Sequence, residues 1–204
     1  MFFKNSIFFS MLTLSFSSFC NQDNECGNNI QAQELTQLII NDSTQLRRHL
    51  TCDARLTRAA TIKVKEMAES GWVIHSGANR RLRDQNFPLP DYYGIGMANQ
   101  VEALAGGQES SVNVWAGFKG SKSHATHLLG KLKFYHEQDK IGVGFIKAPK
   151  SKHIYYWAVY LAKESKINEL NLELGPIPSK GPTGVIFEKS NTNKINVKLI
   201  PSKK

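Results

Sequence analysis

The sequence has little cysteine, fewer acidic than basic residues, and no long apolar run beyond its N-terminus. Three cysteines occur in 204 residues, and 17 acidic residues stand against 26 lysines and arginines. After residue 20, no stretch approaches the roughly 20 consecutive apolar residues that a membrane-spanning helix needs. The sequence therefore predicts no integral membrane span once an N-terminal leader has been removed.

The overall composition is that of a folded domain. Hydrophobic residues make up 41% of the chain and charged residues 21%, which are ordinary values for a globular protein. The length suits one domain with a sizeable core, and we find no internal repeat. From residue 164 to 204, repeated Gly-Pro breaks, lysines and asparagines predict a basic extension, in which residues 185–187 and 195–200 are candidate edge strands.

The N-terminus has the pattern of a processing signal. Lys4 gives a short basic start, and the apolar run from Ile7 to Phe16 has signal-peptide length. We expect a signal peptide over residues 1–20, a polar segment over 21–34, and a secreted or periplasmic protein. A lipoprotein modified at Cys20 is an alternative, although Phe19 is larger than the residue that normally precedes a lipidated cysteine.

Cysteine parity agrees with export. If cleavage removes Cys20, then Cys26 and Cys52 remain as a pair in an oxidising compartment. A bridge between them would close a loop of about 25 residues and contribute roughly 3 kcal/mol in the chain-entropy model. Two free thiols are the alternative.

The excess of basic residues indicates which kinds of partner the protein could bind. The formal net charge is +9, and loss of Lys4 with the leader leaves about +8. Such a charge would suggest nucleic acid in a cytoplasmic protein, but in an exported one it favours an anionic surface, lipid headgroups or acidic glycans. Solubility alone is an equal interpretation. The sequence does not distinguish a monomer from a dimer.

Periodicity predicts helices before a buried sheet. Asp53 is a candidate N-cap and Gly71 a stop signal for one amphipathic helix. The strand over 154–162 is apolar on both faces and must be covered on both sides, which indicates an α-β-α arrangement. Further elements are expected as helices over 31–49, 109–118 and 123–130, strands over 101–104 and 141–146, and a loop over 76–93.

Five short elements occur in a recognisable order over residues 35–163. They are Leu50-x-x-Asp53-x-x-Leu56 leading to Gly71 and His75-Ser76, Glu102-Ala-Leu-Ala105, Trp115 followed by Ser121-x-x-His124-x-x-x-Leu128, Ile141-Gly-Val-Gly144, and Tyr156-Trp157. This order resembles the CAP superfamily (cysteine-rich secretory protein, antigen 5 and pathogenesis-related 1; SCP-like), in a bacterial-type secreted form. The resemblance implies an α+β fold, an α-β-α sandwich with a central, mainly antiparallel sheet.

The resemblance also implies that His75, Glu102 and His124 converge in one cleft. Two neutral imidazoles can hold a divalent metal such as zinc, and Glu102 can orient a histidine, ligate the metal or act as a base. His127 lies three residues after His124 and is an alternative ligand. A hydrogen-bonded histidine pair without metal is the competing interpretation. Ala103 stands where the family usually has asparagine, which puts the shape of the cleft in question.

The sequence offers no convincing nucleophile. Ser76, Ser121 and Ser123 lie close to histidines in sequence, but sequence proximity is not triad geometry. Arginines 80, 81 and 83 form either a solvated loop or an anion-recognition lip beside the cleft.

Three functions follow from these observations. The favoured one is a binding module rather than an enzyme, whose cleft takes a divalent metal and an extracellular lipid, glycan or peptide. The second is a zinc-dependent hydrolase with Glu102 as general base. The third is a structural protein that its basic extension tethers to an anionic surface.

Overall fold

The computed structural model describes residues 26–94, 99–165, 184–189 and 195–200. The predicted signal peptide, the alternative lipidation site at Cys20 and most of the basic extension therefore lie outside the described residues.

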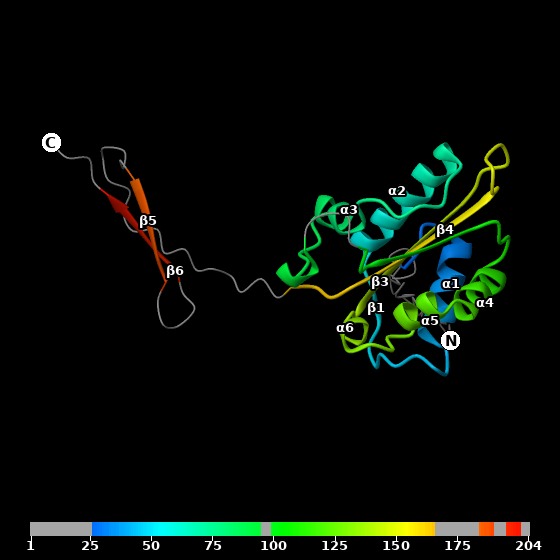
Figure 1. The fold of residues 1–204 in the computed structure, drawn as a ribbon, viewed down its shortest axis with the longest axis horizontal. Coiled ribbons are helices and arrows are strands. Elements are labelled where there is room, and N and C mark those ends of the chain that lie inside the picture. The colour runs from blue at the N-terminus through cyan, green and yellow to red at the C-terminus, as the bar shows by residue number, and fades with distance from the viewer. Residues whose placement is uncertain (1–25, 95–98, 166–183, 190–194, 201–204) are drawn as a thin grey trace, which may run out of the picture.

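A four-stranded sheet forms the centre of the fold (Figure 1). Its strands stand in the order β1-β3-β4-β2, and their bounds are β1 (Thr51–Cys52), β2 (Glu102–Gly106), β3 (Lys140–Lys147) and β4 (Tyr155–Ala162). Strand β4 is antiparallel to both β2 and β3, and the two-residue β1 pairs in parallel with β3. The predicted α+β class is confirmed.

Helices cover both faces of this sheet. One face packs against α1 (Ile30–Ile40), α4 (Ser111–Gly120) and α5 (Lys122–Leu128), and the other against α2 (Ala54–Ser70) and α3 (Ala78–Asp84). Strand β4 explains the two cores, because Trp157 and Val159 point to the first and Tyr156 and Ala158 to the second. Both faces are buried, as the apolar sequence of β4 requires.

The two candidate edge strands of the extension pair with each other. Strand β5 (Gly184–Lys189) is antiparallel to β6 (Ile195–Ile200), and the two form a separate two-stranded sheet.

Helix α2 begins and ends at the predicted signals, whereas α1 is shorter than predicted. The Asp53 carboxylate accepts a hydrogen bond from the Arg55 backbone N–H at 2.8 Å, and Gly71 ends α2 with a φ of 74°. The predicted helix over 31–49 is too long, because α1 ends at Ile40. Asp42 then accepts a hydrogen bond from the Thr44 N–H at 2.9 Å, which favours a turn.

The expectation of a loop over 76–93 is also wrong. Helix α3 forms there, followed by the 3₁₀ helix η2 (Asp91–Tyr93), and a further short helix, α6 (Lys133–His136), was not predicted. Gly77 has a φ of 58° and turns the chain into α3, while Leu82 is fully buried against α2. Burial of Ala78 and Leu82 holds this arginine-rich helix against the domain. Two apolar residues in a seven-residue helix give too weak a periodicity to predict it.

The segment before α1 belongs to the folded domain. Cys26 and Cys52 form the predicted disulfide. The Asn28 side chain accepts from the Phe145 N–H at 2.9 Å and donates to the Phe145 carbonyl at 3.1 Å, so it mimics a strand partner. Within the described residues, the segment from Cys26 to Asn29 therefore packs onto the sheet that the rest of the domain forms.

Helix α2 lies directly on the backbone of β3. A Cβ atom added at Gly142 would stand 2.2 Å from the Thr57 backbone nitrogen, and one at Gly144 would stand 2.6 Å from the Ala60 backbone. No side chain fits between helix and strand at these positions, so the alternating glycines set how closely the two elements approach.

We predict that Gly142→Ala destabilises the fold by about 3 kcal/mol or more, since overpacking against backbone cannot be relieved by a side-chain movement. Gly120→Ala is the matched control, because a Cβ atom at Gly120 meets nothing within 4 Å. Urea unfolding monitored by circular dichroism measures both. Equal stability of the two variants would contradict the close approach.

Candidate functional site

His75 and Glu102, which the resemblance brings into one cleft, are in direct contact. His75 lies in the extended segment after α2, and Glu102 begins β2. The His75 Nδ1 atom is 2.9 Å from the Glu102 Oε1 atom. The His75 side chain is 46% exposed, whereas the Glu102 side chain is fully buried. This contact leaves Nε2 as the nitrogen of His75 that is free to meet a ligand.

The second oxygen of Glu102 is also occupied. The Tyr160 hydroxyl donates to Oε2, and the Arg81 Nη1 atom lies 3.6 Å from the same oxygen and 2.8 Å from the Tyr160 hydroxyl. Burial and the charge of Glu102 raise the pKa of Tyr160 well above its usual value, so this hydroxyl stays protonated and donates. A buried carboxylate needs such donors to offset its desolvation.

Asn99 fixes the chain next to this pair. Its Oδ1 atom accepts from the Glu102 N–H at 2.9 Å, and its Nδ2 atom donates to the Glu102 carbonyl at 2.8 Å. The same Nδ2 atom lies 2.9 Å from Nδ1 of His75. Nδ1 can donate to the Glu102 carboxylate or accept from the Asn99 amide, but not both, and the tautomer that donates to the carboxylate leaves Nε2 as an acceptor.

A lysine of α2 lies beneath the pair. Lys63 is 1% exposed, and its Nζ atom donates to the Ser76 hydroxyl at 2.9 Å. Burial lowers the pKa of Lys63, while the charge of Glu102 opposes this effect. Glu66 lies 3.7 Å from Lys63 and 2.5 Å from Arg81, so it links both cations at the edge of the cluster.

The two histidines of α5 have different surroundings. His124 is half-buried with its ring centroid 5.0 Å from that of Phe118, and burial together with the charge of His75 lowers its pKa. His127 is buried among other groups: its ring is 4.7 Å from that of Tyr135, and its Nε2 atom has no hydrogen-bond partner. Burial and the charge of Arg47 lower the pKa of His127 to about 3. His127 is therefore a buried histidine that stays uncharged in the fold.

In the described part of the chain, no third ligand side chain joins His75 and His124. Across residues 26–94 and 99–165, no three His, Cys, Asp or Glu side chains stand where they could hold one metal ion. Both Glu102 oxygens are engaged, so this carboxylate orients His75 as an outer-shell partner. Nε2 of His75 and the His124 ring remain as the available nitrogen ligands.

Two of the loop arginines and the three serines have specific partners, whereas the buried Nη1 atom of Arg83 has no hydrogen-bond partner among the described residues. Arg81 is 10% exposed in its side chain and belongs to the Glu102 cluster, so the expectation of a solvated position is wrong for it. Arg80 is exposed and lies 3.7 Å from Asp84. Ser76 contacts Lys63, whereas the hydroxyls of Ser121 and Ser123 lie 3.2 Å from each other.

Tyr160, Asn99 and Lys63 were missed by sequence reasoning. Tyr160 lies in an apolar strand and Lys63 on an amphipathic helix, where each has an ordinary explanation. The available signal was Glu102 itself, since a carboxylate in a buried strand requires donors nearby. Tyr160 is the direct cross-strand neighbour of Glu102, a pairing that only the strand register supplies.

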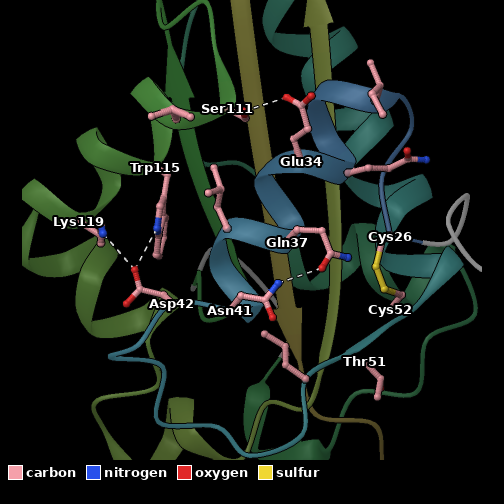
Figure 2. Close-up of a pocket in the computed structure, with 15 residues that line it drawn as sticks. Cys26, Glu34, Gln37, Asn41, Asp42, Thr51, Cys52, Ser111, Trp115 and Lys119 are labelled. Carbon is pink, nitrogen blue, oxygen red and sulfur yellow. Dashed lines mark hydrogen bonds and ion pairs between the residues drawn. A yellow bond between two sulfur atoms is a disulfide. The ribbon is translucent and has the colours of Figure 1, made fainter.

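A large pocket of the described domain lies elsewhere, between α1 and α4 (Figure 2). It has a volume of about 1210 Å³, and none of His75, Glu102 and His124 lines it. The Ser111 hydroxyl donates to Glu34 at 3.0 Å, and Lys119 reaches Asp42 at 3.0 Å. Its apolar side chains are Ile30, Leu38, Leu50, Val112 and Trp115. We call this pocket the α1–α4 groove.

No family model and no curated protein matches the chain. A solved structure of an outer surface protein from Borrelia burgdorferi is similar over 64% of this chain and 90% of its own, at 21% identity and a TM-score of 0.49. In the described part of the chain, no helix has the length and apolar character needed to cross a membrane.

We predict that His127 makes the fold acid-sensitive. Its folded pKa of about 3 lies below the ordinary value of 6.5, so between these values the unfolded chain binds a proton that the folded chain does not. Stability should therefore fall as pH drops from about 6.5 towards 3, by up to about 1.4 kcal/mol per pH unit. His127→Phe should flatten this slope in urea titrations at several pH values, whereas the exposed-site variant His49→Phe should retain it. Equal slopes for His127→Phe and wild type would contradict the assignment.

Proposed function

We propose that this chain is an exported binding module whose cleft holds a divalent metal between His75 and His124. The observation that carries the proposal is the His75–Glu102 contact, in which a buried carboxylate with two further donors orients a half-exposed imidazole. Histidines that ligate metals commonly donate their other N–H to a carboxylate in this way. The Cys26–Cys52 disulfide supports export, because such bonds persist in oxidising compartments.

The chemistry supports zinc or a similar ion. Neutral imidazole is a good ligand for zinc, and the lowered pKa of His124 keeps that ring neutral at physiological pH. A bound metal would leave positions for water or for an oxygen of an extracellular ligand. The CAP resemblance agrees with this cleft and with a secreted protein whose role is binding.

Zinc titration by calorimetry tests this proposal. We expect stoichiometric binding to the wild type, its loss in His75→Ala and in His124→Ala, and a roughly 10- to 100-fold weaker affinity in Glu102→Gln, because the imidazole loses its orienting carboxylate. His49→Ala, at an exposed histidine, is the matched control and should bind as the wild type does.

Circular dichroism and thermal unfolding should accompany each variant, because Glu102 is buried. Zinc affinity that is unchanged in a folded His75→Ala variant would contradict the metal site. In that case the two histidines form a structural pair.

The two other hypotheses receive less support. A general base needs an oxygen free to accept a proton from bound water, and both oxygens of Glu102 already accept hydrogen bonds. This arrangement favours binding over zinc-dependent hydrolysis. Tethering by the basic extension concerns residues 164–204, most of which lie outside the described residues.

A second candidate function is binding of an acyl chain in the α1–α4 groove. The groove has the volume of a small-molecule pocket, and Ile30 and Val112 at its rim are 65% and 63% exposed. Exposed apolar side chains beside an apolar pocket favour a ligand that covers both. This candidate is independent of the metal site, because no residue is shared.

A fatty acid carrying a dansyl group tests the groove. Leu38→Trp should fill the space between α1 and α4 and weaken probe binding at least about tenfold, which corresponds to a loss of about 1.4 kcal/mol. Leu132→Trp, at an exposed leucine outside the groove, should bind the probe as the wild type does. Probe affinity that is equal in wild type and Leu38→Trp would contradict the candidate.

A further inference from the structure

Two apolar side chains are exposed on the segment between α2 and the His75 site. Trp72 and Ile74 are each 58% exposed. The segment alternates, because the side chain of Val73 between them turns inward against Gly106 at the end of β2. Trp72 and Ile74 therefore share one outward face.

The turn between β3 and β4 lies beside this segment. The Lys152 Nζ atom stands 4.0 Å from the centroid of the Trp72 ring, in a cation–π contact. The side chain of His153 packs against Gly106, as that of Val73 does. The end of α2 and this turn also line a common pocket of about 650 Å³, and Figure 1 shows both at one end of the domain. We call Trp72, Ile74, Lys150, Lys152 and Ile154 the tip surface.

The tip surface is basic. Residues 147–154 contain three lysines and no aspartate or glutamate. The acidic groups that face the turn come from neighbouring elements: Glu69, at the end of α2, and Glu109, which accepts a hydrogen bond from the Tyr155 hydroxyl at 2.7 Å. Lys65 lies one turn before Glu69 on α2 and offsets its charge. Lysines 147, 150 and 152 then leave a positive balance.

Ile154 adds an independent observation. This isoleucine is 39% exposed and has a φ of 61°, in the left-handed region. A β-branched residue is strained there, whereas glycine or asparagine would be relaxed. An apolar side chain that is both strained and exposed to water contributes nothing evident to the fold, which points to a role in contact with a partner.

We propose that the tip surface docks onto an anionic lipid bilayer, with Trp72, Ile74 and Ile154 in the headgroup region and Lys150 and Lys152 beside lipid phosphates. Tryptophan is favoured at the membrane–water interface, and lysine stems bury their methylenes while the ammonium stays with the headgroups. An acidic glycan fits the lysines and Trp72 equally well, but it offers the two isoleucines no apolar phase. The proposal does not depend on a metal at His75.

The fluorescence of Trp72 tests the docking directly. The chain has three tryptophans, and Trp115 and Trp157 are only 5% and 0% exposed, so a change of environment on docking reports on Trp72. Vesicles of phosphatidylcholine with phosphatidylglycerol should shift the emission of the exported chain, residues 21–204, to shorter wavelength. Vesicles of phosphatidylcholine alone should shift it far less. An unchanged emission with the anionic vesicles would overturn the proposal.

Charge variants measure the electrostatic contribution to vesicle binding. Lys150→Glu with Lys152→Glu should weaken vesicle binding at least about 30-fold, since each lysine near an anionic surface contributes about 1 kcal/mol. Lys122→Glu with Lys131→Glu makes the same charge change at exposed positions away from the tip surface and should have a much smaller effect. An equal loss in both double variants would overturn the assignment to this surface.

The Ile154→Gly variant distinguishes an effect on membrane docking from an effect on folding. The variant should be as stable as the wild type or more stable, because the strained φ is relieved, and yet it should bind anionic vesicles more weakly. Unchanged vesicle binding in this variant and in Trp72→Ser would overturn the proposal. A Trp72 emission shift of equal size with soluble dextran sulfate would assign the surface to an acidic glycan and overturn docking onto lipid.

Discussion

The contact between α2 and the glycines of β3 is the constraint on which this side of the molecule depends. Gly142 has no side chain, so the helix rests on the strand backbone near Thr57. Gly142 pairs with Tyr160 on β4, and Tyr160 pairs with Glu102 on β2. One row across the sheet thus contains the close helix contact, the hydroxyl donor and the buried carboxylate. The approach of α2 also carries Lys63 into the interior, where its ammonium meets Ser76.

The cluster around Glu102 is better explained by the orientation that it gives to the His75 ring than by a contribution to the stability of the fold. Desolvating a carboxylate beside Arg81 costs several kcal/mol for each ion, and the attraction between them repays this only when the geometry is good. Apolar residues of similar size in place of such an ion pair often stabilise a fold equally well. Here the donors come from three separate elements, namely α3, β4 and the segment that carries His75. Their combined effect is to hold one imidazole in a fixed orientation with its outer nitrogen free, which is a property of a binding site.

The sequence predicted those features that local chemistry determines. The cap at Asp53, the stop at Gly71 and the two long strands follow from residue type and periodicity, and the disulfide follows from parity and compartment. Features set by distant contacts were missed. Helix α1 stops early because Asp42 forms a turn, and α3 exists because Leu82 is buried by α2. In the site, the pairing of His75 with Glu102 came from family resemblance, whereas Tyr160 and Arg81 required the register of the sheet and the position of α3. Membership of the CAP superfamily stays a prediction.

The two proposed surfaces are linked by a short piece of chain. Trp72 and His75 are three residues apart, which corresponds to at most about 10 Å of chain at 3.3 Å per residue. This distance is close to one Debye length at physiological ionic strength. A domain docked through Trp72 would therefore hold His75 within the field of the lipid surface. At a surface potential near −30 mV, the local concentration of a divalent cation rises about tenfold at the surface itself and about two- to threefold one Debye length away. Docking would thus favour occupation of the metal site without any conformational change, because Val73 packed on Gly106 already fixes the segment between the two.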